Sequence, residues 1–181
     1  PQVMNCKIHG NSILSSDYSG AVYCSNSSPA ITDCEIKNNN SSGIFCSGSS
    51  NPFIQNCLIM NNKAKSNGGG ISCGGSRGGT SRPAITQCLI ALNKAPNGAG
   101  VYIPRGTSPT IKNCDIIENL ASIRGGAIFN DSGSCLITNS IIWANSAPVS
   151  PEFYLAGTGS LTAVYTNIKG GWEGIGNIDT D

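Results

Sequence analysis

The sequence contains few charged and few aromatic residues. Lysine, arginine, aspartate and glutamate make up 12% of its 181 residues, aromatic residues make up 6%, and the formal net charge is +1. So small a net charge does not favour a nucleic acid or an acidic membrane surface as the partner. No apolar run approaches the eighteen or so residues of a membrane span. We therefore expect no nucleic-acid partner and no membrane span in this piece.

The chain also lacks the composition of a helical protein. Glycine, asparagine and serine dominate its polar residues, and all three weaken helix interiors. The remaining apolar residues are mostly isoleucine and valine, which suit strands. No basic segment followed by an apolar one stands at the start, so we expect neither a leader nor an anchor in this piece. The composition predicts an all-β protein.

One motif recurs along the whole chain. Its template is Pro-x-Ile-x-Asn-Cys-x-Ile-x-x-Asn, and the copy at residues 109–119 reads PTIKNCDIIEN. A second strand signal follows about eighteen residues after the start of a copy, as in GAIFN at residues 126–130. Seven copies can be aligned, of which the last two are degenerate. They begin at Pro1, Pro29, Pro52, Pro83, Pro109, Cys135 and Leu161.

The repeat predicts three short strands in each unit. In the unit at Pro109, period-two alternation points Ile111 and Ile116 inward. Asn113 separates their strands with a turn, because asparagine tolerates left-handed backbone. The spacing of the units varies from 23 to 31 residues, which suits coils whose turns differ in length. We therefore predict a parallel β-helix of about seven coils, roughly 30 Å long, as a single domain over residues 1–181.

The cysteines fall into two columns when the units are aligned. Metal ligation and a disulfide framework are the functional alternatives, but no Cys-x-x-Cys pair is present. In-register β-carbons about 4.8 Å apart are also farther apart than the roughly 3.8 Å of a disulfide. We interpret the cysteines as small core residues with free thiols, although the odd total of nine leaves the redox compartment open. The first column holds Cys6, Cys34, Cys57, Cys88 and Cys114, and the second holds Cys24, Cys46 and Cys73.

Asparagines form two further columns. Their amides can hydrogen-bond both the local backbone and the amide of the next coil, so we interpret them as structural ladders. The column in the first turn holds Asn5, Asn56, Asn113 and Asn139, with Asp33 and Gln87 as substitutes. The column that closes the second strand holds Asn11, Asn39, Asn62, Asn93, Asn119 and Asn145.

These motifs carry a family resemblance. The glycine-rich strands GGAIFN, GGGI, GAGV and SGAV and the PTIKNC units resemble the right-handed parallel β-helix repeats of the pectin-lyase-like superfamily. Within that group, the Gly-Gly-Ala-Ile and Phe-containing motifs are most similar to polymorphic outer membrane protein repeats. The tail, NSIIWANSAP followed by YTNIKGGWEGIGNID, resembles the closing coils of many secreted bacterial and archaeal β-helix proteins. The resemblance covers nearly the whole chain and implies a right-handed single-stranded coil and an exported protein, but it implies no single activity.

Enzymes of that superfamily act on polysaccharides and need clustered carboxylates, which this chain does not show in sequence. Asp33 and Glu35 lie about three coils from Asp115, roughly 15 Å away at this coil spacing. Asp131 is the one carboxylate close to the glycine-rich strands, and the single histidine, His9, is typical of a solvated surface residue. We predict no catalytic residue, no metal site and no cofactor, unless a neighbouring coil outside this piece supplies them.

Outward aromatic side chains on the glycine-rich strands form the candidate site. If Val22 and its equivalents point inward, the residues that follow them point outward. Such a strip can stack on sugar rings or pack against another protein, whereas mutual stacking or cover by a loop explains it equally well. Ser72 interrupts the series. The aromatic strip consists of Tyr23, Phe45, Tyr102 and Phe129, with Tyr154 as its extension.

Three arginines are expected near one end of the same sheet. Arg77, Arg82 and Arg105 come from adjoining coils. Together they can pair with carboxylates or sulfates. Solvated loops explain them as well.

The two ends of the chain differ. Pro1 stands at the first template position, so we interpret the N-terminal end as cut from a longer array or stacked on another molecule. Residues 170–181 abandon the template. We expect them to cap the last coil, with Trp172, Ile175 and Ile178 folded over its apolar end.

Two functions from different classes remain. The first is a non-catalytic module of an exported bacterial or archaeal surface protein, acting as a structural, adhesive, lattice or filament component at the cell surface or outside the cell. Its partners would be a surface polysaccharide, another protein, or further copies along the rod or at its ends. The alternative is a fragment of a polysaccharide lyase, hydrolase or epimerase. The ligand, the oligomeric state and the source stay open.

Overall fold

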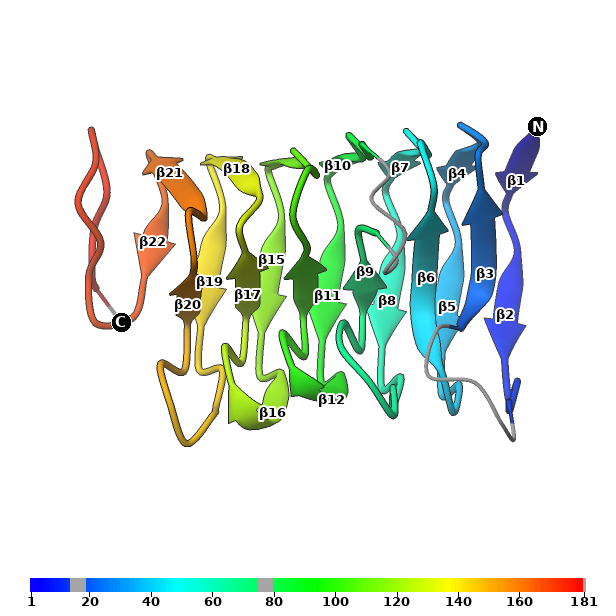
Figure 1. Cartoon of the computed structure of the whole chain (residues 1–181), viewed down its shortest axis with the longest axis horizontal. Helices are drawn as coiled ribbons and strands as arrows, with labels where there is room; N and C mark the ends of the chain where they lie inside the picture. Colours follow the sequence, from blue (N-terminus) through cyan, green and yellow to red (C-terminus); the bar gives the residue numbers. More distant parts are fainter. Residues whose placement is uncertain (14–18, 75–79, 181) are drawn as a thin grey trace.

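The structure confirms a parallel β-helix with three strands in each coil. It is a computed structural model and describes residues 1–13, 19–74 and 80–180. Two sheets contain seven strands each and a third contains six, so the chain winds about six turns, close to the predicted seven. Every pair between these strands is parallel. Figure 1 shows the coils side by side along the longest axis, from the N-terminus to the C-terminus.

The first sheet collects the first strand of each coil. Its register pairs Ile31 with Ile54, Ile54 with Ile85, and so on, which places one inward residue of each repeat above its equivalent in the next. These isoleucines are almost fully buried. The strands are β1 (Gln2–Met4), β4 (Ala30–Thr32), β7 (Phe53–Gln55), β10 (Ala84–Thr86), β14 (Thr110–Lys112), β18 (Ser134–Thr138) and β21 (Ser160–Val164).

The second sheet is built in the same way from the second strands. Each of its strands contributes one inward isoleucine, from Ile8 in the first coil to Ile168 in the last. The strands are β2 (Lys7–His9), β5 (Glu35–Lys37), β8 (Leu58–Met60), β11 (Leu89–Ala91), β15 (Asp115–Ile117), β19 (Ile141–Trp143) and β22 (Asn167–Ile168).

The third sheet holds the glycine-rich strands. Ile44, Ile71, Val101 and Ile128 are completely buried, and they meet the isoleucine files of the other two sheets in one core. Burying each such side chain contributes about 1.5–3 kcal/mol. The strands are β3 (Gly20–Ser25), β6 (Ser42–Ser47), β9 (Ile71–Ser72), β13 (Val101–Ile103), β17 (Ile128–Asp131) and β20 (Phe153–Ala156).

A fourth, two-stranded sheet lies between the second and third sheets, in addition to the three strands expected in each coil. It consists of β12 (Lys94–Asn97) and β16 (Leu120–Arg124). Ala95 and Ala121 form its inner side and pack in a small separate cluster of alanines. Because alanine contributes a single methyl group, this sheet gives only a weak hydrophobic period in the sequence.

Residues with left-handed backbone stand at two corners of each coil. The first corner lies between the first and second strands, and the second corner directly follows the second strand. At the first corner, the column that begins with Asn5 has φ of 49–56° in all seven units. The second corner has positive φ in every unit as well, although its residues include Leu92, Glu118 and Ala144. Such residues rarely favour this conformation. The geometry of the coil, rather than local propensity, therefore sets the second corner.

A buried asparagine ladder follows the second corner. Asn93 illustrates the pattern: its Oδ1 accepts from the backbone N–H and the Nδ2 of Asn62 at 3.0 and 3.1 Å. Its own Nδ2 donates to the Ile59 carbonyl at 2.9 Å and to Asn119 Oδ1 at 3.0 Å. Each rung therefore satisfies polar groups of two neighbouring coils, which would be costly to leave buried without partners. The ladder runs through Asn39, Asn62, Asn93, Asn119 and Asn145.

The glycine at the start of the third strand is explained by this ladder. A Cβ on Gly70 would lie 2.6 Å from the Gly100 carbonyl oxygen, 2.8 Å from Ile90 Cγ2 and 3.0 Å from Asn93 Nδ2. The close approach of the next coil leaves no room for a side chain there. Asparagine and glycine motifs therefore alternate along the sequence because the residues at these two positions pack against each other in neighbouring coils.

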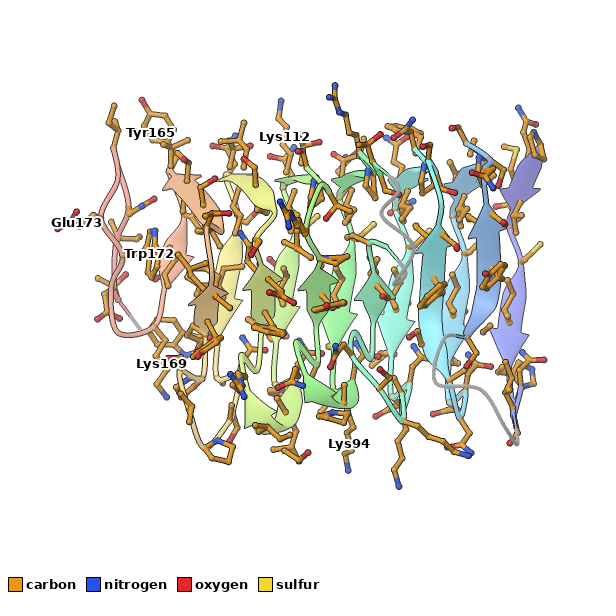
Figure 2. All side chains as sticks on the ribbon, viewed as in Figure 1. Lys94, Lys112, Tyr165, Lys169, Trp172 and Glu173 are labelled. Carbon is orange, nitrogen blue, oxygen red and sulfur yellow. The ribbon has the colours of Figure 1, made fainter. Side chains whose placement is uncertain are left out.

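The segment after β22 covers part of the last coil. Trp172 packs edge-on against Phe153, with ring centroids 5.0 Å apart, and points toward the coil from the terminal segment (Figure 2). Ile178 pairs with Asn167 through the backbone, but its side chain is 53% exposed, and Ile175 is 71% exposed. Of the three residues expected to cover the end, Trp172 is the one that packs on the core.

A candidate binding surface on the third sheet

The residues of the aromatic strip occupy one register position on the outer face of the third sheet. Tyr23 pairs with Phe45, and Tyr102 pairs with Phe129, which pairs with Tyr154. Ser72 takes the same position in the intervening coil. Because the preceding residue of each strand faces the core, these side chains leave the sheet on its outer side. The strip therefore follows the axis of the rod, one residue in each coil.

The rings stack in two groups on either side of Ser72. Tyr23 and Phe45 are nearly parallel, with centroids 5.4 Å apart and an angle of 7° between their planes. Tyr102 lies 5.5 Å from Phe129 at 30°, and Tyr154 lies 5.4 Å from Phe129 at 47°. These separations are typical of attractive aromatic pairs. The structure thus contains the mutual stacking that was one alternative for the strip.

Exposure along the strip is uneven. Tyr23 is 53% exposed, whereas Phe45 is 2% exposed and Phe129 is 8% exposed. Tyr102 and Tyr154 are intermediate. The strip is therefore not the uniformly open apolar surface that a flat row of rings would give. Its accessible parts are Tyr23 and the two tyrosines that flank Phe129.

An arginine that the sequence interpretation missed joins the second group. The Arg124 guanidinium lies 4.9 Å from the centroid of Tyr154 and 5.8 Å from that of Phe129, and its Nη1 donates to the Tyr154 hydroxyl at 3.2 Å. Arg124 ends β16, just before Gly125, whose φ of 63° turns the chain toward the third sheet. The sequence feature that precedes the strand is the tripeptide Arg-Gly-Gly. It does not by itself place Arg124 beside the rings, because that position depends on the turn at Gly125, which alignment of the strands does not predict.

A carboxylate lies at the other side of the same group. The Tyr102 hydroxyl donates to Asp131 Oδ2 at 3.4 Å. We call Tyr102, Phe129, Tyr154, Arg124 and Asp131 the ring cluster. It combines apolar ring surface with a cation and an anion, which can bind the ring face and the hydroxyl groups of a sugar, or the polar rim of a protein partner.

The structure describes two of the three arginines of the predicted group. Arg77 lies outside the described residues. Arg82 precedes β10 and Arg105 follows β13, so the two occupy different register positions, and both are exposed. The Arg82 backbone N–H donates to Asn51 Oδ1 at 2.7 Å, which fixes its loop rather than its guanidinium. No shared anion site follows from their positions.

The carboxylates of the second sheet stay apart. Glu35 pairs with Lys37 and Lys7 on the surface, and the hydrogen bond from Lys37 lowers the pKa of Glu35. Asp115 stands at the same register position three coils farther along. Within the described residues, no three histidine, cysteine, aspartate or glutamate side chains come together as metal ligands would. His9 is exposed on β2.

The cysteines line the core. All nine are free, and all but Cys6 are buried. Along the first column, the Cys114 thiol donates to the Lys112 carbonyl at 3.2 Å, and its sulfur accepts from the Cys88 backbone N–H at 3.4 Å. In and near the second column, burial raises the pKa of Cys73, and it raises that of Cys135 to about 12. Cys73 and Cys135 are therefore buried neutral thiols, which act as packing residues rather than nucleophiles.

Comparison with known families agrees with this architecture. The family described as right handed beta helix region matches residues 2–82. No curated protein matches the chain significantly. The match, over the N-terminal part of the chain, and the stacked parallel sheets are consistent with a right-handed β-helix repeat protein. In the described part of the chain, no helix is long and apolar enough to cross a membrane.

Proposed function

We propose that the chain is a non-catalytic β-helix module of an exported bacterial or archaeal surface protein, and that the ring cluster contacts a surface polysaccharide or another protein. The observation that carries the proposal is the stack of Tyr102, Phe129 and Tyr154, with Arg124 held against it. Each of these residues comes from a different strand of a stacked array. The surface is therefore preorganised, which reduces the entropy lost on binding.

Carbohydrate is the partner that the chemistry of the cluster favours. Half-exposed tyrosines offer apolar ring faces with polar edges, and Arg124 and Asp131 supply a donor and an acceptor beside them. A sugar ring presents the matching combination of C–H faces and hydroxyl groups. The spread of the other carboxylates over separate coils supports binding without hydrolysis, because most glycoside hydrolases use two carboxylates across one bond.

Export and a place at the cell surface are part of the proposal. Their support is the resemblance of the repeats to those of bacterial surface proteins and of the tail to secreted β-helix proteins. A rod of stacked coils also suits a stalk or lattice component, since its length grows with the number of repeats.

A glycan-array screen tests the proposal. Any bound glycan is then incubated with the protein and recovered for mass spectrometry, and we expect it to be intact. Tyr154→Ala removes one ring and the partner of Arg124, and we expect it to weaken binding roughly tenfold. Tyr165→Ala is the matched control, because Tyr165 is 62% exposed and lies outside the cluster. Cleavage of the glycan, or equal loss in both variants, contradicts the proposal.

A further inference from the structure

Three lysines, Lys63, Lys65 and Lys94, line a hollow that shares no residue with the ring cluster. Lys63 and Lys94 pair directly through a parallel bridge between adjacent coils, and Lys65 follows two residues after Lys63. All three line a hollow of about 360 Å³ and are exposed. Figure 2 shows Lys94 projecting from the edge of the rod opposite to Lys112.

This arrangement concentrates positive charge. Like charges placed directly opposite each other on a sheet destabilise it. Neither Lys63 nor Lys94 forms an ion pair with any residue in the described ranges. No acidic residue is among the described residues that line the hollow. A bound anion would remove the repulsion between the lysines, so the hollow has the charge of an anion site.

The floor of the hollow is apolar. Ala64 and Ala95 are buried beneath it, and Pro96 and Leu120 form its side, with Leu120 45% exposed. No aromatic residue is among its described lining residues, so it lacks the stacking surface that single-stranded nucleic acids use. An apolar floor with a cationic rim instead fits a sugar ring that carries anionic groups.

We propose that this lysine hollow binds sulfate ester groups of a sulfated polysaccharide. Lysine is a compact point charge suited to tetrahedral oxyanions, whereas planar carboxylates are matched best by the bidentate fork of arginine, which the described lining lacks. A sulfate monoester carries a single charge, so bringing it to an apolar floor costs less desolvation than bringing a phosphate dianion. The lysine hollow shares no residue with the ring cluster, so its binding is independent of the function proposed above.

Binding of immobilised dextran sulfate, measured by surface plasmon resonance over a series of salt concentrations, tests the inference. Unsulfated dextran, alginate and a phosphorylated mannan provide the neutral, carboxylated and phosphorylated comparisons. The test variant is Lys63→Gln with Lys94→Gln. The control is Lys7→Gln with Lys112→Gln, which removes the same charge from other exposed positions. Circular dichroism establishes that both variants fold.

We expect the test variant to bind dextran sulfate about tenfold or more weakly than the parent, with a shallower salt dependence, and the control to bind like the parent. Equal weakening in the two double variants would show attraction by net charge alone. The inference is overturned by that result and equally by a lack of binding to dextran sulfate. Equal or tighter binding of alginate or of the phosphorylated mannan also overturns it.

Discussion

The side-chain amide of Asn145 donates to Glu152 Oε2 at 2.6 Å, and this bond ends the asparagine ladder. In every earlier rung the same donor meets the Oδ1 of the next asparagine. The following unit has Gly171 at that position, which has no side chain to offer. Glu152 therefore supplies the acceptor from another part of the chain, and it is 9% exposed there. The carboxylate takes the place of an amide.

Because a carboxylate replaces an amide as the acceptor, the stability of the last coils depends on pH. Burial raises the pKa of Glu152 above its ordinary value of 4.5, and the bond from Asn145 only partly opposes the effect. The folded protein then holds this proton more tightly than the unfolded chain does. The stabilising contribution is therefore complete below pH 4.5 and is lost as the pH rises through the folded-state pKa.

Glu152→Gln should accordingly melt at a higher temperature than the parent at pH 7, because glutamine keeps an acceptor for Asn145 and cannot ionise. The difference should shrink as the pH falls below 4.5. Thermal melts across this range measure it, and Glu173→Gln, at an exposed position of the terminal segment, should show no such trend. A gain for Glu152→Gln that is the same at every pH contradicts this explanation.

The ladder itself should contribute strongly to stability. Asn39 is 2% exposed and exchanges hydrogen bonds with Asn11, Asn62 and the Ile8 carbonyl. Asn39→Ala leaves these groups buried without partners, so we expect a loss of about 2–4 kcal/mol in the free energy of unfolding. Asn40→Ala, at the exposed neighbouring residue, should cost no more than about 0.5 kcal/mol. Urea titration compares the two, and equal losses would show that the ladder has no special role.

Thiol counting tests the interpretation of the cysteines. In the folded protein only Cys6 is partly accessible, so an aromatic disulfide reagent should react quickly with about one thiol. In denaturant without reductant, all nine should react. A total below nine would reveal disulfides, and rapid reaction of several thiols in the folded protein would show that the columns are not packed in the core.

The fold was largely predictable because its signal is repeated. Each inward isoleucine, such as Ile54 or Ile85, recurs at a fixed template position, and a shift of one residue would turn every one of them outward. Two features lacked such a signal. The small sheet of β12 and β16 rests on alanines, and the second corner places Leu92 and Glu118 in a conformation that their propensities oppose.

The candidate site was less predictable than the fold. The alignment of the strands predicts that Tyr102, Phe129 and Tyr154 share one position, but it carries no information about their exposure. Phe129 is covered between two neighbours, and Arg124 reaches it from the end of β16, where the turn toward the third sheet depends on Gly125. Likewise, Lys63, Lys65 and Lys94 form one group only because two coils are stacked in register. Side chains outside the template positions are placed by the stacking of the coils, not by the template.

The most direct test of the account measures distances along one register column. Lys7, Ile141 and Asn167 occupy the same position of the second sheet, five and six coils apart from the first. Spin labels introduced through a non-natural amino acid at positions 7 and 141, and at 7 and 167, should give backbone separations of about 24 and 29 Å. Pulsed electron paramagnetic resonance resolves a difference of one coil spacing between the two separations. Two distances that differ by about one coil spacing support the stacked coils, and distances unrelated to the number of coils contradict them.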